Sequence, residues 1–90
     1  MAVITEKILE DILSYLEKSI KNLAKEAFEN LEFDEKSHAD EFLQNQYDIR
    51  LENLLVGKNS GIHHLESGMK NKIIQRKQII FEQISKQYYN

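Results

Sequence analysis

Apolar residues recur at alternating steps of four and three between residues 9 and 31, and they place one apolar stripe along an α-helix. The stripe consists of Leu9, Leu13, Leu16, Ile20, Leu23, Ala27 and Leu31, and it is widened by Ile8, Ile12, Ala24 and Phe28. A stripe of this length is unstable in water, so the rest of the chain must cover it. The pattern therefore predicts a helix over residues 5–31 around which the other elements pack.

The start of this helix carries two signals. Thr5 is suited to the N-cap, and Glu6 follows it in the first turn, where the helix dipole favours negative charge. Ile4 and Leu9 have the spacing of a hydrophobic staple. At the other end, Asn30 is the candidate for a left-handed closing residue.

A second helix is predicted over residues 35–56, capped either by Asp34 or by Ser37 with Asp40. Its apolar pattern is broken whichever face is chosen. Gln46 and Asn53 interrupt a stripe through Ala39, Phe42, Ile49 and Val56, whereas Arg50 interrupts one through Leu43, Tyr47 and Leu54. We interpret this as a narrow buried face beside a polar surface that is shared with a partner. Gly57 is expected to end the helix as a C′ glycine.

A third helix is predicted over residues 61–88. Its main stripe runs through Ile62, Leu65, Met69, Ile73, Ile80 and Ile84, with a second row at Ile74, Phe81 and Tyr88. Ser67 and Gly68 weaken helix propensity by about 1 kcal/mol. Because the stripe passes through them in phase, we expect one continuous helix here.

These elements predict an all-α fold, an antiparallel three-helix bundle of long helices in a single domain spanning residues 1–90. The chain has 90 residues, 41% of them hydrophobic, so a core is feasible but small. Long helices with wide apolar faces favour self-association, most often as a two-fold dimer.

Composition narrows the chemistry. The chain has no cysteine, which excludes disulfides, thiolate nucleophiles and zinc–cysteine sites. No apolar run approaches the roughly 18 residues of a membrane span, and no signal peptide is visible, so we expect a cytoplasmic protein without membrane contact. Abundant Lys, Asn, Ile and Glu suggest an AT-rich genome, bacterial or phage.

Charge is distributed unevenly along the chain. Residues 1–57 carry 13 acidic and 6 basic side chains, whereas residues 58–90 carry 2 acidic and 6 basic ones. One interpretation is that the C-terminal helix neutralises an acidic neighbour within the bundle. The alternative is that Lys70, Lys72, Arg76 and Lys77 form a patch that binds an anion such as the phosphate of a nucleotide or nucleic acid, or an acidic partner. The acidic net charge of −3 disfavours nucleic acid.

Histidines offer the only metal-ligand spacings. His38 lies three residues from both Glu35 and Glu41, and His63 lies three before Glu66. A bundle metal site needs further inward carboxylates, so we expect no metal and no cofactor. His63 and His64, at the start of the third helix, are expected at the surface, where they would make an interface pH-sensitive only if they contact a partner.

No nucleophile constellation or phosphate-binding loop is present, so catalysis is not expected. The sequence favours a non-enzymatic protein-binding module: a small inhibitor, an antitoxin- or immunity-like neutraliser, or an assembly adaptor that occludes a larger protein. The candidate contact residues are Glu41, Gln46, Arg50 and Asn53. The alternative is an oligomeric regulator that binds nucleic acid or a nucleotide through the basic run.

Overall fold

The computed structural model describes residues 4–30 and 36–88, and within them it contains three α-helices and no strand. These are α1 (Glu6–Asn30), α2 (Lys36–Val56) and α3 (Ser67–Tyr88), with a short 3₁₀ helix, η1 (Ile62–His64), before α3. The predicted all-α class is confirmed. The ends of α1 and α2 agree with the predicted boundaries to within a residue.

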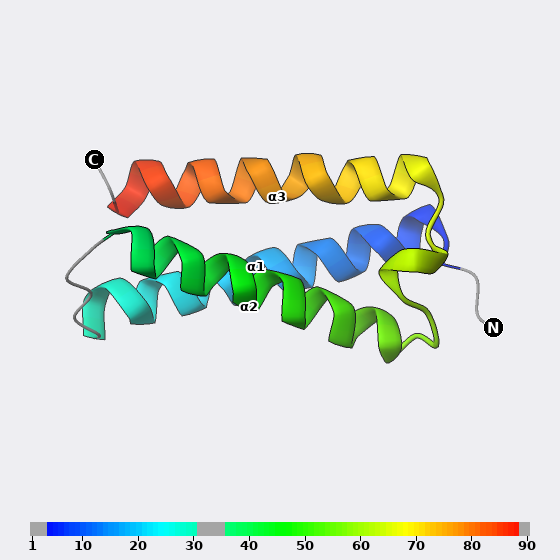
Figure 1. Cartoon of the computed structure of the whole chain (residues 1–90), viewed down its shortest axis with the longest axis horizontal. Helices are drawn as coiled ribbons and strands as arrows, with labels where there is room; N and C mark the ends of the chain where they lie inside the picture. Colours follow the sequence, from blue (N-terminus) through cyan, green and yellow to red (C-terminus); the bar gives the residue numbers. More distant parts are fainter. Residues whose placement is uncertain (1–3, 31–35, 89–90) are drawn as a thin grey trace.

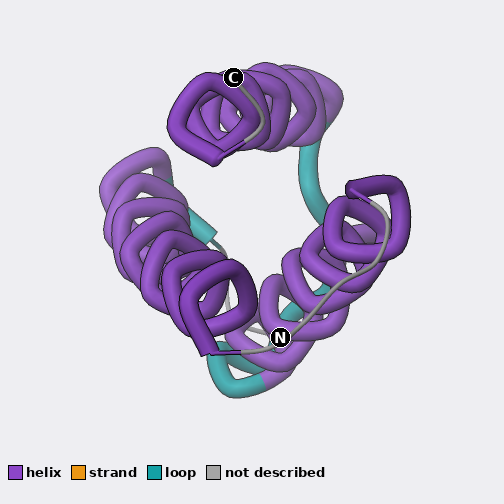
Figure 2. The backbone as a smooth tube through the Cα atoms, turned by 90° about the vertical axis from the view of Figure 1, so that its left-hand side faces the viewer, coloured by secondary structure: helices purple, strands orange, loops and turns teal. Residues whose placement is uncertain are grey.

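The helices form an elongated antiparallel bundle of 43 × 20 × 18 Å. Helices α1 and α3 run in the same direction and α2 runs against both (Figure 1). Viewed end-on, the three helices occupy the corners of a triangle (Figure 2). Helix α1 packs closely against both α2 and α3, so it is the common wall of the core.

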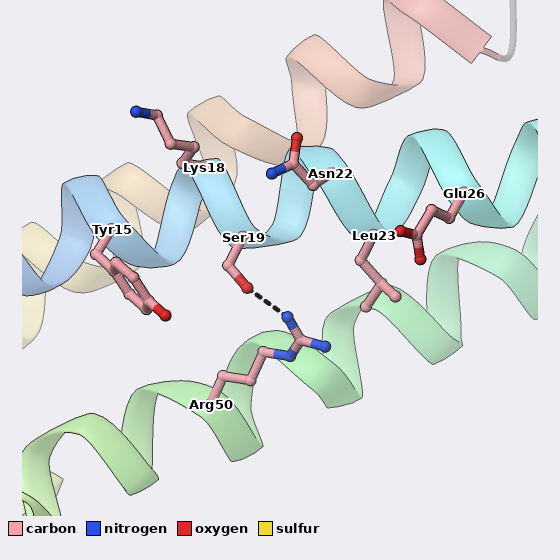
Figure 3. A pocket seen from close by; sticks show the side chains of 7 residues that line it. All are labelled: Tyr15, Lys18, Ser19, Asn22, Leu23, Glu26 and Arg50. Carbon is pink, nitrogen blue, oxygen red and sulfur yellow. Dashed lines mark hydrogen bonds between the residues drawn. The ribbon is translucent and has the colours of Figure 1, made fainter.

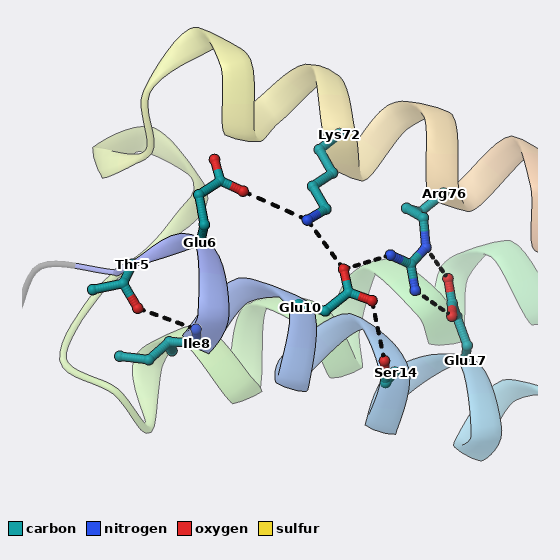
Figure 4. A network of polar contacts seen from close by, with 8 residues as sticks. All are labelled: Thr5, Glu6, Ile8, Glu10, Ser14, Glu17, Lys72 and Arg76. Atoms are coloured by element: carbon teal, nitrogen blue, oxygen red, sulfur yellow. Dashed lines mark hydrogen bonds and ion pairs between the residues drawn. The ribbon is translucent and has the colours of Figure 1, made fainter.

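The predicted stripe of α1 fills this core. Leu9, Leu13, Leu16 and Ile20 are fully buried, and Leu23 packs at the edge. Thr5 acts as the N-cap, because its Oγ1 accepts a hydrogen bond from the Ile8 N–H at 3.2 Å (Figure 4). The described residues of the α1 stripe and of the main α3 stripe are thus buried or half-buried within one chain.

The buried face of helix α2 is neither of the two broken stripes that the sequence suggested. Its buried residues recur every fourth position: Ala39, Leu43, Tyr47, Leu51 and Leu55. Such a row is inclined by about 26° to the helix axis, which suits the oblique crossing of α2 over α1 in Figure 1. Ile49 and Val56 point outward, and the interruptions at Gln46, Arg50 and Asn53 therefore lie beside the core contact rather than within it.

The end of α2 also differs from the prediction, because Gly57 is not the left-handed residue. Asn59 takes that conformation, with φ 58°. The Ser60 N–H donates to the Leu55 carbonyl and the Asn59 N–H to the Val56 carbonyl, both at 2.9 Å. This is a Schellman motif with asparagine at C′, two residues later than expected.

The continuous third helix is the clearest error of the sequence prediction. Gly61 and Leu65 are extended, and the intervening turn has 3₁₀ hydrogen bonds from His64 to Gly61 and from Leu65 to Ile62. Residues three apart eclipse in a 3₁₀ turn, so Ile62 and Leu65 both reach the core cluster that contains Ile4. Helix α3 begins only at Ser67. A β-carbon on Gly68 would have no neighbour within 4 Å, so no other helix packs closely against this glycine.

Several smaller predictions fall outside the described residues, namely those for Leu31, Asp34, Glu35 and the Ser37 side chain. At the far end of the bundle, Tyr88 stacks on Phe28 with ring centroids 4.7 Å apart, so it continues the core row as predicted. Ile74, predicted for the same row, is exposed.

Tyr47 is the buried residue through which α2 meets α3. Its ring lies edge-on to Phe81, with 5.9 Å between centroids, and the Lys77 ammonium lies 5.5 Å from the Tyr47 ring centre. The hydroxyl is buried without a hydrogen-bond partner among the described residues. Burial first, and the negative charge of Glu17 second, raise the pKa of Tyr47 to about 12.

We predict that Tyr47→Phe is as stable as the wild type at neutral pH, or more stable by up to about 1 kcal/mol, because a buried unpaired hydroxyl is removed. The pKa is 10.0 in the unfolded reference and about 12 in the fold, so the wild type loses stability as pH rises through this window. The variant should lack that loss. Urea unfolding at neutral and alkaline pH measures it, and identical pH dependence in both proteins would contradict the assignment.

Candidate functional site

The basic run of α3 faces the acidic side of α1. Lys72 Nζ lies 3.0 Å from Glu10 Oε2 and 3.5 Å from Glu6 Oε2. Arg76 donates to Glu17 through Nε and Nη2, both at 2.8 Å, and to Glu10 through Nη1 at 2.7 Å (Figure 4). Charge neutralisation between helices, the first of the two interpretations, is confirmed for these cations.

This arrangement shifts the ionisation of its members. The hydrogen bond from Arg76, followed by that from Lys72, holds the pKa of Glu10 below its usual value. The hydrogen bond to Glu10 raises the pKa of Lys72, and those to Glu17 and Glu10 raise the pKa of Arg76. The two-pronged contact between Arg76 and Glu17 also fixes the register of α3 on α1, because a guanidinium matches a carboxylate in one orientation.

The other two cations of the run differ from each other. Lys77 pairs with Asp48 of α2 at 2.9 Å, so it links α3 to α2. Lys70 is half-buried and has no carboxylate partner among the described residues. Three of the four predicted anion-binding residues are therefore engaged inside the bundle.

We predict that Arg76→Ala lowers the free energy of unfolding by about 1–2 kcal/mol, because Glu10 and Glu17 lose a shared, half-buried donor. Lys70→Ala is the matched control and should change it by less than about 0.5 kcal/mol. Arg76→Lys should fall between them, since an ammonium keeps the charge but not the fork. Equal effects of Arg76→Ala and Lys70→Ala on urea unfolding would disprove the structural role.

Three of the four predicted partner-contact residues gather at one place. Gln46, Arg50 and Asn53 lie along the edge of α2 that faces α1, and the Arg50 Nε donates to Gln46 Oε1 at 3.4 Å. Glu41 is exposed but lies nine residues before Arg50, which places it about 180° around the helix. The structure does not bring Glu41 to the others.

An open groove runs between α1 and α2 beside these residues, and we name it the α1–α2 groove. The described residues that line the groove belong to α1 and α2, and none belongs to α3. The main ones are Tyr15, Ser19, Leu23, Arg50, Asn53 and Leu54. Arg50 reaches across it from α2 and donates to the Ser19 hydroxyl of α1 (Figure 3). Tyr15, which sequence analysis assigned no role, is 66% exposed at its rim.

The electrostatic state of Arg50 contrasts with that of Arg76. Both guanidinium groups bridge two helices, but Arg50 donates only to the neutral oxygens of Ser19 and Gln46. Among the described residues it has no carboxylate partner, although the chain has 15 acidic side chains. Lys18 and Glu26 also line the groove, without an ion pair to Arg50. The groove thus holds a guanidinium with unused donors next to the exposed Tyr15 ring and the half-buried Leu23 and Leu54.

The histidines form no comparable site. His63 and His64 are exposed on η1 rather than in the first turn of a long helix. Within residues 4–30 and 36–88, no three histidine, aspartate or glutamate side chains are close enough to hold a metal ion. His38 is exposed on α2, and its predicted neighbour Glu35 lies outside the described residues.

Comparison with protein-family models, with curated proteins and with solved structures gave no match to this chain. Of the helices that the structure describes, none combines the length and apolarity required to cross a bilayer. A function for this chain is therefore inferred from the geometry of its own surface.

Proposed function

We propose that this protein is a non-enzymatic binding module that docks onto a larger protein through the α1–α2 groove. The single observation that carries the proposal is that the half-buried guanidinium of Arg50 lies in the groove and donates only to neutral acceptors. A buried or half-buried arginine is most stable opposite a carboxylate. The docking partner supplies that carboxylate.

The residues around Arg50 support a protein partner. Tyr15 is exposed at one wall of the groove, and the half-buried Leu23 and Leu54 also line it. Tyrosine and arginine are the residue types most enriched among those that dominate binding energy in protein interfaces. The matching surface is an acidic side chain flanked by apolar ones, carried by a helix or an extended segment.

The mechanism that follows is occlusion. The groove is open and is lined by two helices, so a segment of another protein can lie in it. A module of this kind acts by covering a surface of its target or by bringing two proteins together. Inhibitor, neutraliser and adaptor are the roles consistent with such a mechanism.

The alternative function, binding nucleic acid or a nucleotide through the basic run, is less well supported. Lys72, Arg76 and Lys77 would each have to give up a carboxylate of the bundle before contacting phosphate. Lys70 alone provides too little charge for the multiple phosphate contacts on which such binding depends.

Immobilised wild-type protein should retain a defined protein from an extract of the cells that produce it. Tyr15→Ser and Arg50→Gln should each weaken that complex by about 30-fold or more, as expected for loss of about 2 kcal/mol at a dominant contact. Dissociation constants of the identified partner, measured by calorimetry for each variant, provide the test.

The matched control is Ile79→Ser, which alters a side chain 49% exposed on α3, outside the groove, and should bind as the wild type does. A partner that binds all four proteins equally, or the absence of any specifically retained protein, would contradict the proposal. Retention of nucleic acid that is lost steeply as salt increases would favour the alternative instead.

A further inference from the structure

The α1–α2 groove extends beyond the region around Arg50. Past the Tyr15 ring it continues between the start of α1 and the end of α2, where its lining residues are Ile8, Asp11, Ile12, Tyr15, Leu54 and Lys58. Because Tyr15 and Leu54 line both parts, the two parts adjoin. Along α1 the lining runs from Ile8 to Glu26, a distance of about 27 Å along the helix axis.

The groove is polar in its middle and apolar on either side. Arg50 donates to Ser19 at the middle, and its Nη2 has no partner among the described residues. Tyr15 lies on one side of this contact and Leu23 on the other (Figure 3). An occupant that matches the groove therefore has one carboxylate for Arg50, with apolar side chains before and after it.

The walls of the groove determine which backbone can lie in it. Both walls are α-helices, whose N–H and C=O groups are hydrogen-bonded within their own helix. The described residues contain no strand to which an extended segment could add. Such a segment would lose water from its own backbone groups without gaining backbone partners. A helix bonds its own backbone, so only its side chains are desolvated in the groove.

We propose that the α1–α2 groove binds an amphipathic helix of about 18 residues from the partner protein, which becomes the fourth helix of the bundle. Its contact face carries one Asp or Glu opposite Arg50, and apolar residues at steps of three and four on both sides of it. No α3 residue lines the groove, so the bound helix packs on α1 and α2 without displacing α3. The inference rests on the proposed function and specifies the partner's chemistry.

The place of Arg50 fixes where the acidic residue lies within the bound helix. Ser19, which accepts the Arg50 hydrogen bond, is about 16 Å from Ile8 and about 10 Å from Glu26 along α1. The acidic residue is therefore an inner one, with about three turns on the Ile8 side and about two on the Glu26 side. The longer side faces Ile12 and Leu54, so it carries most of the apolar contact.

Length distinguishes this occupant from an extended one. A helix advances 1.5 Å per residue and a strand about 3.3 Å, so an extended segment would span the same groove with about 8 residues. Affinity for a helix should therefore increase with peptide length up to about 18 residues, whereas affinity for an extended segment should reach its limit at about half that length.

The first experiment selects binders from two peptide libraries displayed on phage, with immobilised wild-type protein as the target. One library contains peptides of about 18 residues, with alanine and lysine fixed on the outer face of a helix and random residues on the inner face. The other contains random peptides of about 9 residues, which are too short to form a stable helix in water. The tightest binders should come from the first library and should share an Asp or Glu at one inner position.

The second experiment measures what that carboxylate contributes, by fluorescence anisotropy of a selected peptide. A peptide with the corresponding amide should bind the wild type at least about 10-fold more weakly. Arg50→Gln should bind both peptides equally, and Arg50→Lys should discriminate to an intermediate degree, because it keeps the charge without the fork. Ile79→Ser, which alters an exposed side chain of α3, is the matched control and should discriminate as the wild type does. Circular dichroism shows that each variant is folded.

Amide resonances of the protein locate the bound peptide. Those of Asp11, Tyr15 and Lys58 should shift when the peptide is added, because they lie along the groove. Those of Ile49 and Ile79, exposed elsewhere on α2 and α3, should not.

Three results would overturn the inference. They are peptides of about 9 residues that bind as tightly as those of about 18, helical binders without a shared acidic residue, and shifts at Ile49 or Ile79 in place of the groove. If neither library gives a binder but a protein from the extract is retained through Tyr15 and Arg50, the helical occupant is wrong and the proposed function stands. If no such protein is retained either, both are wrong.

Discussion

The burial of the α1 stripe is the constraint on which the rest of the structure depends. A single apolar face about 100° wide or more must be covered, and one neighbouring helix cannot cover it alone. The structure meets this requirement from two sides, with α2 crossing one edge of the stripe and α3 running along the other. Leu13 and Leu16 are consequently inaccessible to solvent, and the other two helices take their positions from α1.

The charges of the chain follow the same arrangement. Glu10 and Glu17 lie along the side of α1 that receives α3, and Arg76 holds both. Three basic side chains of residues 58–90, namely Lys72, Arg76 and Lys77, therefore form ion pairs with acidic residues of the N-terminal half within the bundle. Arg50 differs because the partners it meets, Ser19 and Gln46, are neutral. That difference, rather than the number of basic residues, separates a structural cation from a candidate contact.

Sequence reasoning succeeded where a pattern was periodic along a straight helix axis. The stripe of α1 and its Thr5 cap were predicted because steps of three and four keep one face in register. The buried row of α2 recurs every four residues and so winds around the helix, which no fixed-face pattern describes. The break before Ser67 was missed because Leu65 reaches the core from an extended backbone as readily as from a helix.

The candidate site was predictable to a similar extent. Interruptions of the apolar pattern located Gln46, Arg50 and Asn53, because polar residues near a packed face must lie at its edge. They did not locate Tyr15, whose place in the groove depends on how α1 and α2 cross. Nor did they show which cations are paired, because pairing between α1 and α3 depends on the register of two helices that are far apart in sequence.

Native-state hydrogen exchange tests the central role of α1 most directly. If the burial of its stripe holds the bundle together, the amides of residues 13–24 should exchange most slowly of all, with a free energy of opening equal to that of global unfolding. Amides of α2 and α3 should open at or below this free energy. Amides of α2 or α3 that remain protected after α1 has exchanged would show that those two helices are stable without it, and would contradict the account.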